Sequence, residues 1–118
     1  MPSSHDTAHE FFGSFERYTL ENGLTVLMKP VDHARSVTVQ VWVQAGSAYE
    51  NDSNNGLSHL LEHMLFKGTD RFSGREVNDL VEEAGGRQNA ATSKEYTKYY
   101  VTLPSKHWER GLELLSQM

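Results

Sequence analysis

The stretch SVTVQVWVQA, residues 36–45, alternates strictly between apolar and polar side chains. Because successive side chains of a strand point to opposite faces, this period of two predicts a β-strand with one buried face. Four valines share the face that we expect to be buried. That face consists of Val37, Val39, Val41 and Val43, and the opposite face of Thr38, Gln40, Trp42 and Gln44.

Further strands are predicted on both sides of this stretch. An Asn22-Gly23 pair between two short apolar runs suits the positive φ angles of a tight turn and predicts a β-hairpin. Two more runs, which follow Gly85-Gly86, are separated by a short polar connection. The predicted strands are residues 18–20, 24–29, 87–92 and 96–103.

Three helices are predicted from apolar residues at helical spacing. The first covers residues 57–66, and the second ends near Ala84 after a Ser73–Glu76 capping box. The third opens at Pro104-Ser105 and continues to Met118. Their expected buried faces are Leu57, Leu60, Leu61, Met64 and Leu65; Val77, Leu80, Val81 and Ala84; and Trp108, Leu112, Leu115 and Met118.

These elements predict an α+β fold, a mostly antiparallel sheet with helices packed on one face. The last helix has no stop signal and reaches Met118 in the middle of its apolar face. We therefore expect residues 15–118 to be the N-terminal part of a domain that is incomplete at its C-terminus. Residues 1–14 are polar and are expected to form a flexible arm.

Composition excludes several classes of function. The 118 residues have a net charge of −5 and no cysteine, which argues against a nucleic-acid partner and excludes disulfides, thiolate metal sites and cysteine nucleophiles. No apolar run approaches the roughly 20 residues of a membrane helix. No secretory or transit signal is recognisable, so we expect a cytoplasmic protein unless Met1 is not the native start.

The sequence His59-Leu60-Leu61-Glu62-His63 lies on the first predicted helix. Histidines four residues apart project from one helix face and are close enough to share a metal ion, and imidazole nitrogen is a preferred zinc ligand. Glu62 borders the same face, where a carboxylate can take a proton from a metal-bound water that attacks a peptide carbonyl. The order H-x-x-E-H is that of inverzincin peptidases. The alternative is a surface helix whose histidines bind no metal.

The surrounding sequence closely resembles the pitrilysin/insulinase family, nearest to its mitochondrial processing peptidases and their bacterial relatives. The resemblance covers residues 18–118 in two blocks that occur in the family's order and separation. The first block is Glu50-Asn51, Asn54-Asn55-Gly56 and HLLEHMLFKGT at residues 59–69; the second is Gly85-Gly86, NAATS at residues 89–93, Glu95, Thr97 and Tyr99-Tyr100.

The resemblance implies the LuxS/processing-peptidase-like metallopeptidase fold and a zinc-dependent endopeptidase that cleaves extended peptides or presequences. It implies that His59 and His63 bind Zn²⁺ and that Glu62 is the general base. It also implies that Asn89 and Ala90 lie on an edge strand that pairs with the substrate backbone, and that Phe66 lines a side-chain pocket. The alternatives are a core role for Phe66 and a strand-end or turn role for Asn89.

The family's third zinc ligand is a glutamate roughly 70 to 80 residues beyond the motif, and catalytic zinc sites use three protein ligands. The resemblance therefore implies that this chain alone binds zinc weakly and is inactive. It implies three partners: a peptide or unfolded protein substrate, the remainder of the domain, and a homologous second domain or subunit. We expect no nucleic-acid and no membrane partner.

Two other functions match part of this sequence pattern. A lyase that cleaves ribosylhomocysteine has a similar motif, but it completes its zinc site with a cysteine, which this chain lacks. The second alternative is a non-catalytic subunit that binds substrate or serves a structural role in a processing-peptidase-like complex. Such subunits lack the motif, which is intact here.

Overall fold

The computed structural model describes residues 15–118, and the flexible arm expected at residues 1–14 lies outside this range. The chain divides into two compact units, Met1–Ala34 and Arg35–Met118. The described part of the first unit is a β-hairpin. The second unit contains a three-stranded sheet and three α-helices.

The hairpin pairs β1 (Glu16–Thr19) with β2 (Thr25–Met28) in antiparallel fashion. Its turn places Gly23 at φ 87°, a left-handed conformation that glycine adopts without a steric penalty. The amide of Leu20 donates to the carbonyl of Leu24 at 2.9 Å and closes the turn. The hairpin predicted around Asn22-Gly23 is therefore confirmed, with strand ends that differ by one or two residues.

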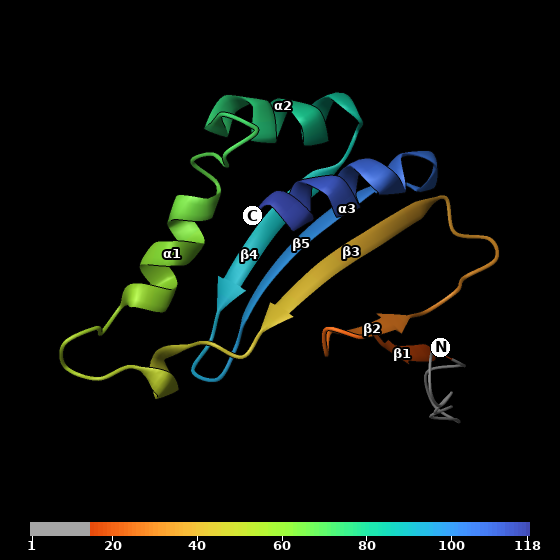
Figure 1. Ribbon diagram of the computed structural model, residues 1–118. Helices are drawn as coiled ribbons and strands as arrows, with labels where there is room; N and C mark the ends of the chain where they lie inside the picture. Colours follow the sequence, from red (N-terminus) through yellow and green to blue (C-terminus); the bar gives the residue numbers. More distant parts are fainter. Residues whose placement is uncertain (1–14) are drawn as a thin grey trace. The chain divides into compact units, whose positions relative to one another are not determined.

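The sheet of the second unit consists of β3 (Ser36–Val43), β4 (Arg87–Thr92) and β5 (Thr97–Pro104). The strand order is β3-β5-β4 and both pairs are antiparallel (Figure 1). The central strand is β5, so β3 and β4 are the two edges of the sheet in the described part of the chain. All three strands were predicted, with ends within two residues.

The helices are α1 (Leu57–Leu65), α2 (Gly74–Glu83) and α3 (Trp108–Gln117). Two short 3₁₀-helices, η1 (Ser47–Tyr49) and η2 (Ser105–His107), precede α1 and α3. The predicted capping box begins α2: the Glu76 amide donates to Ser73 Oγ, and the Ser73 amide donates to the Glu76 carboxylate at 2.7 Å.

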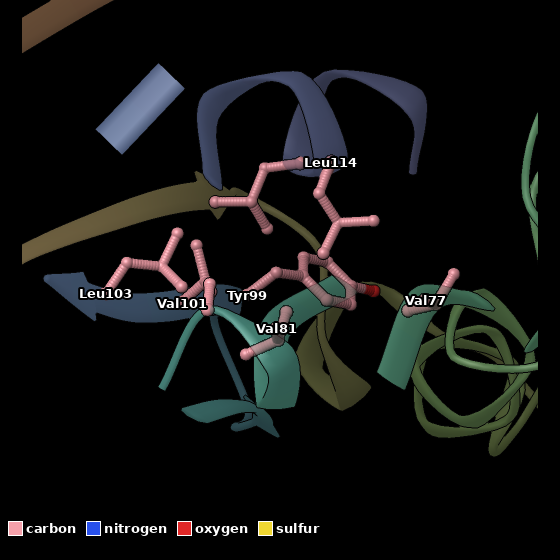
Figure 2. Packing of buried hydrophobic residues seen from close by; sticks show 8 residues of the cluster. Val77, Val81, Tyr99, Val101, Leu103 and Leu114 are labelled. Atoms are coloured by element: carbon pink, nitrogen blue, oxygen red, sulfur yellow. The ribbon is translucent and has the colours of Figure 1, made fainter. Parts of the chain in front are cut away.

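The hydrophobic core lies between one face of the sheet and the helices. Figure 2 shows side chains of β5 packed between Leu114 of α3 and Val81 of α2. The helices cover this one face, as predicted, and the fold is α+β. The core consists of Val77, Val81, Ala84, Tyr99, Val101, Leu103, Leu114 and Leu115.

The buried face of α3 differs from the predicted one. Trp108 and Leu112 are about half exposed, whereas Gly111 and Leu114 are buried. The reason is the close approach of the helix to the sheet, since a Cβ on Gly111 would lie 2.9 Å from Cγ1 of Val101. The helix therefore presents its glycine to the sheet, and the expectation for Trp108 and Leu112 was wrong.

The apolar face of α1 is also more exposed than predicted, because no α1 residue is buried. At the end of β3, Val41 and Val43 are exposed as well, whereas Val37 and Val39 are half-buried. An open apolar groove of about 430 Å³ is lined by residues of both regions and of α3, among them Val41, Val43, Leu57, Leu61, Leu65, Leu115 and Met118. Within residues 15–118, no helix has the length and apolar character needed to cross a membrane.

Candidate metal centre

Helix α1 presents His59 and His63 on one face, one turn apart. Their Nε2 atoms are 2.9 Å from each other, and their ring centroids are 4.6 Å apart. Both side chains are exposed. The spacing of four residues thus brings two imidazole nitrogens together, as the sequence predicted.

Glu62 lies on the same helix and is half-buried. Its carboxylate accepts a hydrogen bond from the hydroxyl of Thr92, the last residue of β4. This contact joins two segments that are 30 residues apart in the sequence. The motif glutamate is therefore held against the end of the sheet, next to the two histidines.

The start of α1 is fixed by Glu50, which precedes the helix. The N-cap residue is Gly56, with φ 86°, and it has no side chain that could accept a capping hydrogen bond. The Glu50 carboxylate instead accepts hydrogen bonds from the amides of Ser58 at 2.8 Å and Gly56 at 2.6 Å. Both hydrogen bonds hold the pKa of Glu50 below its ordinary value, and the bond from Ser58 has the larger effect. They satisfy amides that a helix N-terminus leaves unpaired.

The turn between β4 and β5 is docked on the segment that follows β3. The Ala48 amide donates to the Lys94 carbonyl at 2.7 Å, and Thr97 Oγ1 donates to the Ala45 carbonyl at 2.8 Å. The contact requires glycine at position 46, because a Cβ there would lie 2.3 Å from the Ser93 carbonyl oxygen. The position of Thr92 beside α1 therefore depends on this docking.

A cavity of about 600 Å³ lies beside the motif. Both His59 and Glu62 line it, together with the Glu50 cap and the end of β4. The cavity is therefore adjacent to an imidazole and to a carboxylate of the H-x-x-E-H motif. Its full lining is Ser47, Glu50, Asn55, Gly56, His59, Glu62, Ala91, Thr92, Ser93 and Lys94.

Two aromatic residues near the motif, Tyr99 and Phe66, do not line this cavity. Burial raises the pKa of the Tyr99 hydroxyl, and the negative charge of Glu62 raises it further, so Tyr99 stays neutral at physiological pH. Phe66 follows α1 directly and lies with its ring centroid 6.5 Å from that of Tyr99. It packs against the hydrophobic core, so its pocket-lining role stays a prediction.

Asn89 and Ala90 lie on β4, at an edge of the described sheet. Asn89 is exposed, and its Oδ1 accepts a hydrogen bond from the Ala90 amide at 2.8 Å. Ala90 is half-buried and contacts the core. The edge position agrees with the sequence-based expectation, and the pairing of these residues with substrate stays a prediction.

Within residues 15–118, no three His, Asp or Glu side chains are grouped so that they could hold one metal ion. Glu50 is near the motif, but its oxygens accept amide hydrogen bonds from the start of α1. The motif thus brings together two imidazoles and one carboxylate within the described residues.

Two residues of the site were given no role from the sequence. Glu50 and Thr92 both stand in the blocks that carry the family resemblance. The sequence does contain a signal for Glu50, since this carboxylate precedes a helix that has no capping side chain of its own. No local pattern indicates Thr92, because its partner is distant in the sequence.

The insulinase family model (peptidase family M16) matches residues 25–118. The zinc protease YmxG of Bacillus subtilis is 43% identical over 103 residues, which are 87% of this chain and 25% of that protein. A probable mitochondrial-processing peptidase subunit beta of Arabidopsis thaliana is 43% identical over 100 residues, which are 85% of this chain and 19% of that protein.

A solved protease from Helicobacter pylori has a similar structure, with a TM-score of 0.82 and 33% sequence identity. The match covers 87% of this chain and 25% of that one. The chain therefore spans about a quarter of the length of these relatives, or less. Because the family model matches most of the length of the chain, the chain belongs to the insulinase family of peptidases, M16.

Proposed function

We propose that this chain supplies two zinc ligands and the general base of a metalloendopeptidase that hydrolyses peptide bonds in extended peptides. The observation that carries the proposal is the arrangement of His59, Glu62 and His63 on α1, beside a cavity of about 600 Å³. Relatives named zinc protease and processing peptidase support the same reaction class.

The donor set fits zinc. The Nε2 atoms of His59 and His63 are 2.9 Å apart. Zinc–nitrogen bonds are about 2.0–2.1 Å, so both atoms can bind one ion. Imidazole nitrogen is among the ligands that zinc prefers, and no cysteine competes for the metal. His59 and His63 would thus hold the ion, and a third protein ligand would come from outside this chain.

Zinc, when bound, would polarise the peptide carbonyl and lower the pKa of the attacking water. The role of Glu62 is proton transfer: its carboxylate accepts a proton from that water and passes it to the leaving amine. Thr92 bonds to the Glu62 carboxylate, and both residues line the cavity. His59 lines the same cavity, so metal and base would act on one bound peptide bond.

The substrate would bind as an added strand on β4. This strand is an edge of the described sheet and ends at Thr92, next to Glu62. An extended peptide paired with it would use main-chain hydrogen bonds for affinity, with Asn89 and Ala90 at the pairing positions. Such binding requires an unfolded or flexible substrate segment, such as a presequence.

The active enzyme would need more than this chain. Its third zinc ligand and the rest of the domain would lie outside residues 1–118, and a homologous domain or subunit would complete the substrate chamber. The name "subunit beta" of the processing-peptidase relatives supports a partner of this kind. On its own, the chain would bind zinc weakly through two histidines and would not cleave peptides.

The test measures zinc content and peptide hydrolysis in this chain and in a version extended by about 100 residues, the reach needed for a third ligand. We expect one tight zinc per extended protein. Glu62→Gln should keep this zinc and lower hydrolysis by about 10²- to 10⁴-fold, since proton transfer by a positioned base contributes that much. His59→Ala should lose the metal.

Glu82→Gln is the matched control, because Glu82 is an exposed glutamate on α2. It should change neither zinc content nor rate. An extended protein without zinc, or one that cleaves equally well with Gln at position 62, would overturn the mechanism in favour of a non-catalytic subunit.

A further inference from the structure

We infer that Thr92 is a positioning residue, whose hydroxyl orients the Glu62 carboxylate from the strand that is proposed to bind substrate. The inference rests on the proposed function, because it concerns the same reaction. It adds a residue that acts through the base and links the base to the substrate-binding edge.

The hydrogen bond itself is the first support. Thr92 Oγ1 donates to Glu62 Oε2, and in the described part of the chain this is the one hydrogen bond of the Glu62 side chain. Both residues are half-buried. A hydrogen bond to an ionised carboxylate is stronger than one between neutral groups, so it can select one orientation of Glu62.

Glu62 needs such a contact because helix α1 does little to restrict the orientation of its side chain. A glutamate has several freely rotating side-chain bonds, and α1 has no buried residue to fix the helix tightly. A misplacement of about 1 Å in a reacting group can lower the rate by about 10²-fold. The orientation of the base therefore depends on a contact from outside α1.

Thr92 is well placed to provide this contact. Threonine is branched at Cβ and has few side-chain rotamers, and its backbone pairs with Thr97 of β5. The following turn is closed by a hydrogen bond from the Ser93 amide to the Tyr96 carbonyl at 2.8 Å. The same turn is docked through Lys94 on Ala48. The donor is thus held by the sheet rather than by α1.

A link between substrate binding and catalysis follows from this position. Thr92 belongs to β4, and a peptide that adds to β4 would pair with the backbone next to it. Pairing would restrict the movement of Thr92 and, through the hydrogen bond, that of Glu62. A well-paired substrate would therefore also orient its own base.

The test compares Thr92→Val, which removes the hydroxyl at nearly constant shape, with Thr92→Ser, which keeps it, in the zinc-loaded extended protein. We expect Thr92→Val to lower kcat by about 10- to 100-fold with little change in KM or zinc content, since only the base is misplaced. Thr92→Ser should keep most of the activity. Thr102→Val is the matched control, because the Thr102 hydroxyl bonds to Thr38, at 2.9 Å, rather than to a motif residue; it should have wild-type kcat.

A second comparison separates positioning from a structural role. In Glu62→Asp the carboxylate is one methylene shorter and loses its reach to Thr92, so Thr92→Val should add little further loss there. Thermal melting checks that each variant folds, and Thr92→Ala is a second variant without the hydroxyl. A wild-type kcat in both Thr92→Val and Thr92→Ala, equal losses in Thr92→Val and Thr92→Ser, or an undiminished loss in the Glu62→Asp background would overturn the inference.

Failure of this inference differs from failure of the proposed function. If Glu62→Gln is inactive and Thr92→Val is fully active, the base stands and the positioning role falls. If Glu62→Gln is fully active, the proposed reaction itself falls.

Discussion

Two helices of nearly equal length, α1 and α2, are held in the fold by different means. Helix α2 is capped by its own Ser73–Glu76 box and buries Val77 and Val81. Helix α1 buries no residue, and its N-terminus is capped by Glu50, which lies outside the helix. The helix with the H-x-x-E-H motif thus buries less apolar surface in the core than α2 does.

This difference separates stability from chemistry. The core formed by α2, α3 and β5 provides the buried apolar contacts (Figure 2). Helix α1 contacts this core through the partly buried Leu65 and is otherwise positioned by polar contacts, the Glu50 cap and the Thr92–Glu62 hydrogen bond. Local stability depends on buried apolar contacts, so we expect α1 to open more easily than α2.

The largest expected effect is on core stability. Leu103→Ala removes a side chain that is 2% exposed and should lower the free energy of unfolding by about 2–5 kcal/mol. Leu60→Ala on α1, where the side chain is 57% exposed, should change it by less than about 0.5 kcal/mol. Denaturant unfolding of both variants measures the contrast, and equal losses would show that α1 belongs to the core.

A smaller effect is expected from pH. The pKa of Glu50 is lowered by its amide hydrogen bonds, so the cap is complete above the ordinary glutamate pKa and is lost as pH falls through the lowered value. Hydrogen-exchange protection of α1 should therefore fall on acidification. In Glu50→Gln that dependence should be absent.

The pKa of Glu76 is also lowered, because its carboxylate accepts hydrogen bonds from Ser73. Hydrogen-exchange protection of α2 should therefore also fall on acidification. Its buried valines should keep the change in α2 smaller than that in α1. A larger loss of protection in α2 than in α1 would contradict the comparison.

The sequence was sufficient to predict the elements of the fold. Alternation in β3, the Asn22-Gly23 turn and the Ser73–Glu76 box are local signals, and the structure has each where it was expected. The spacing of His59 and His63 predicted their proximity for the same reason. The faces of α1 and α3 were less predictable, because burial depends on which partners are present and on Gly111, which has no side chain to mark a face.

The polar contacts of the site could not be predicted from local sequence patterns. Glu50 reaches the start of α1 across a loop, and Thr92, which bonds to Glu62, precedes the β4–β5 turn that contacts residues 45–48. Such pairs depend on tertiary structure, since nothing in the spacing of the two residues sets their distance. They are also the contacts that hold Glu62 and the start of α1 in place.

The most direct test of the account is amide hydrogen exchange of α1 and α2 with and without zinc. Binding to His59 and His63 would bridge one turn of α1, so zinc should slow exchange in α1 and leave α2 nearly unchanged, and His63→Ala should abolish the effect. Without zinc, we expect amide exchange to be faster in α1 than in α2. Equal protection of the two helices together with no response of α1 to zinc would contradict it.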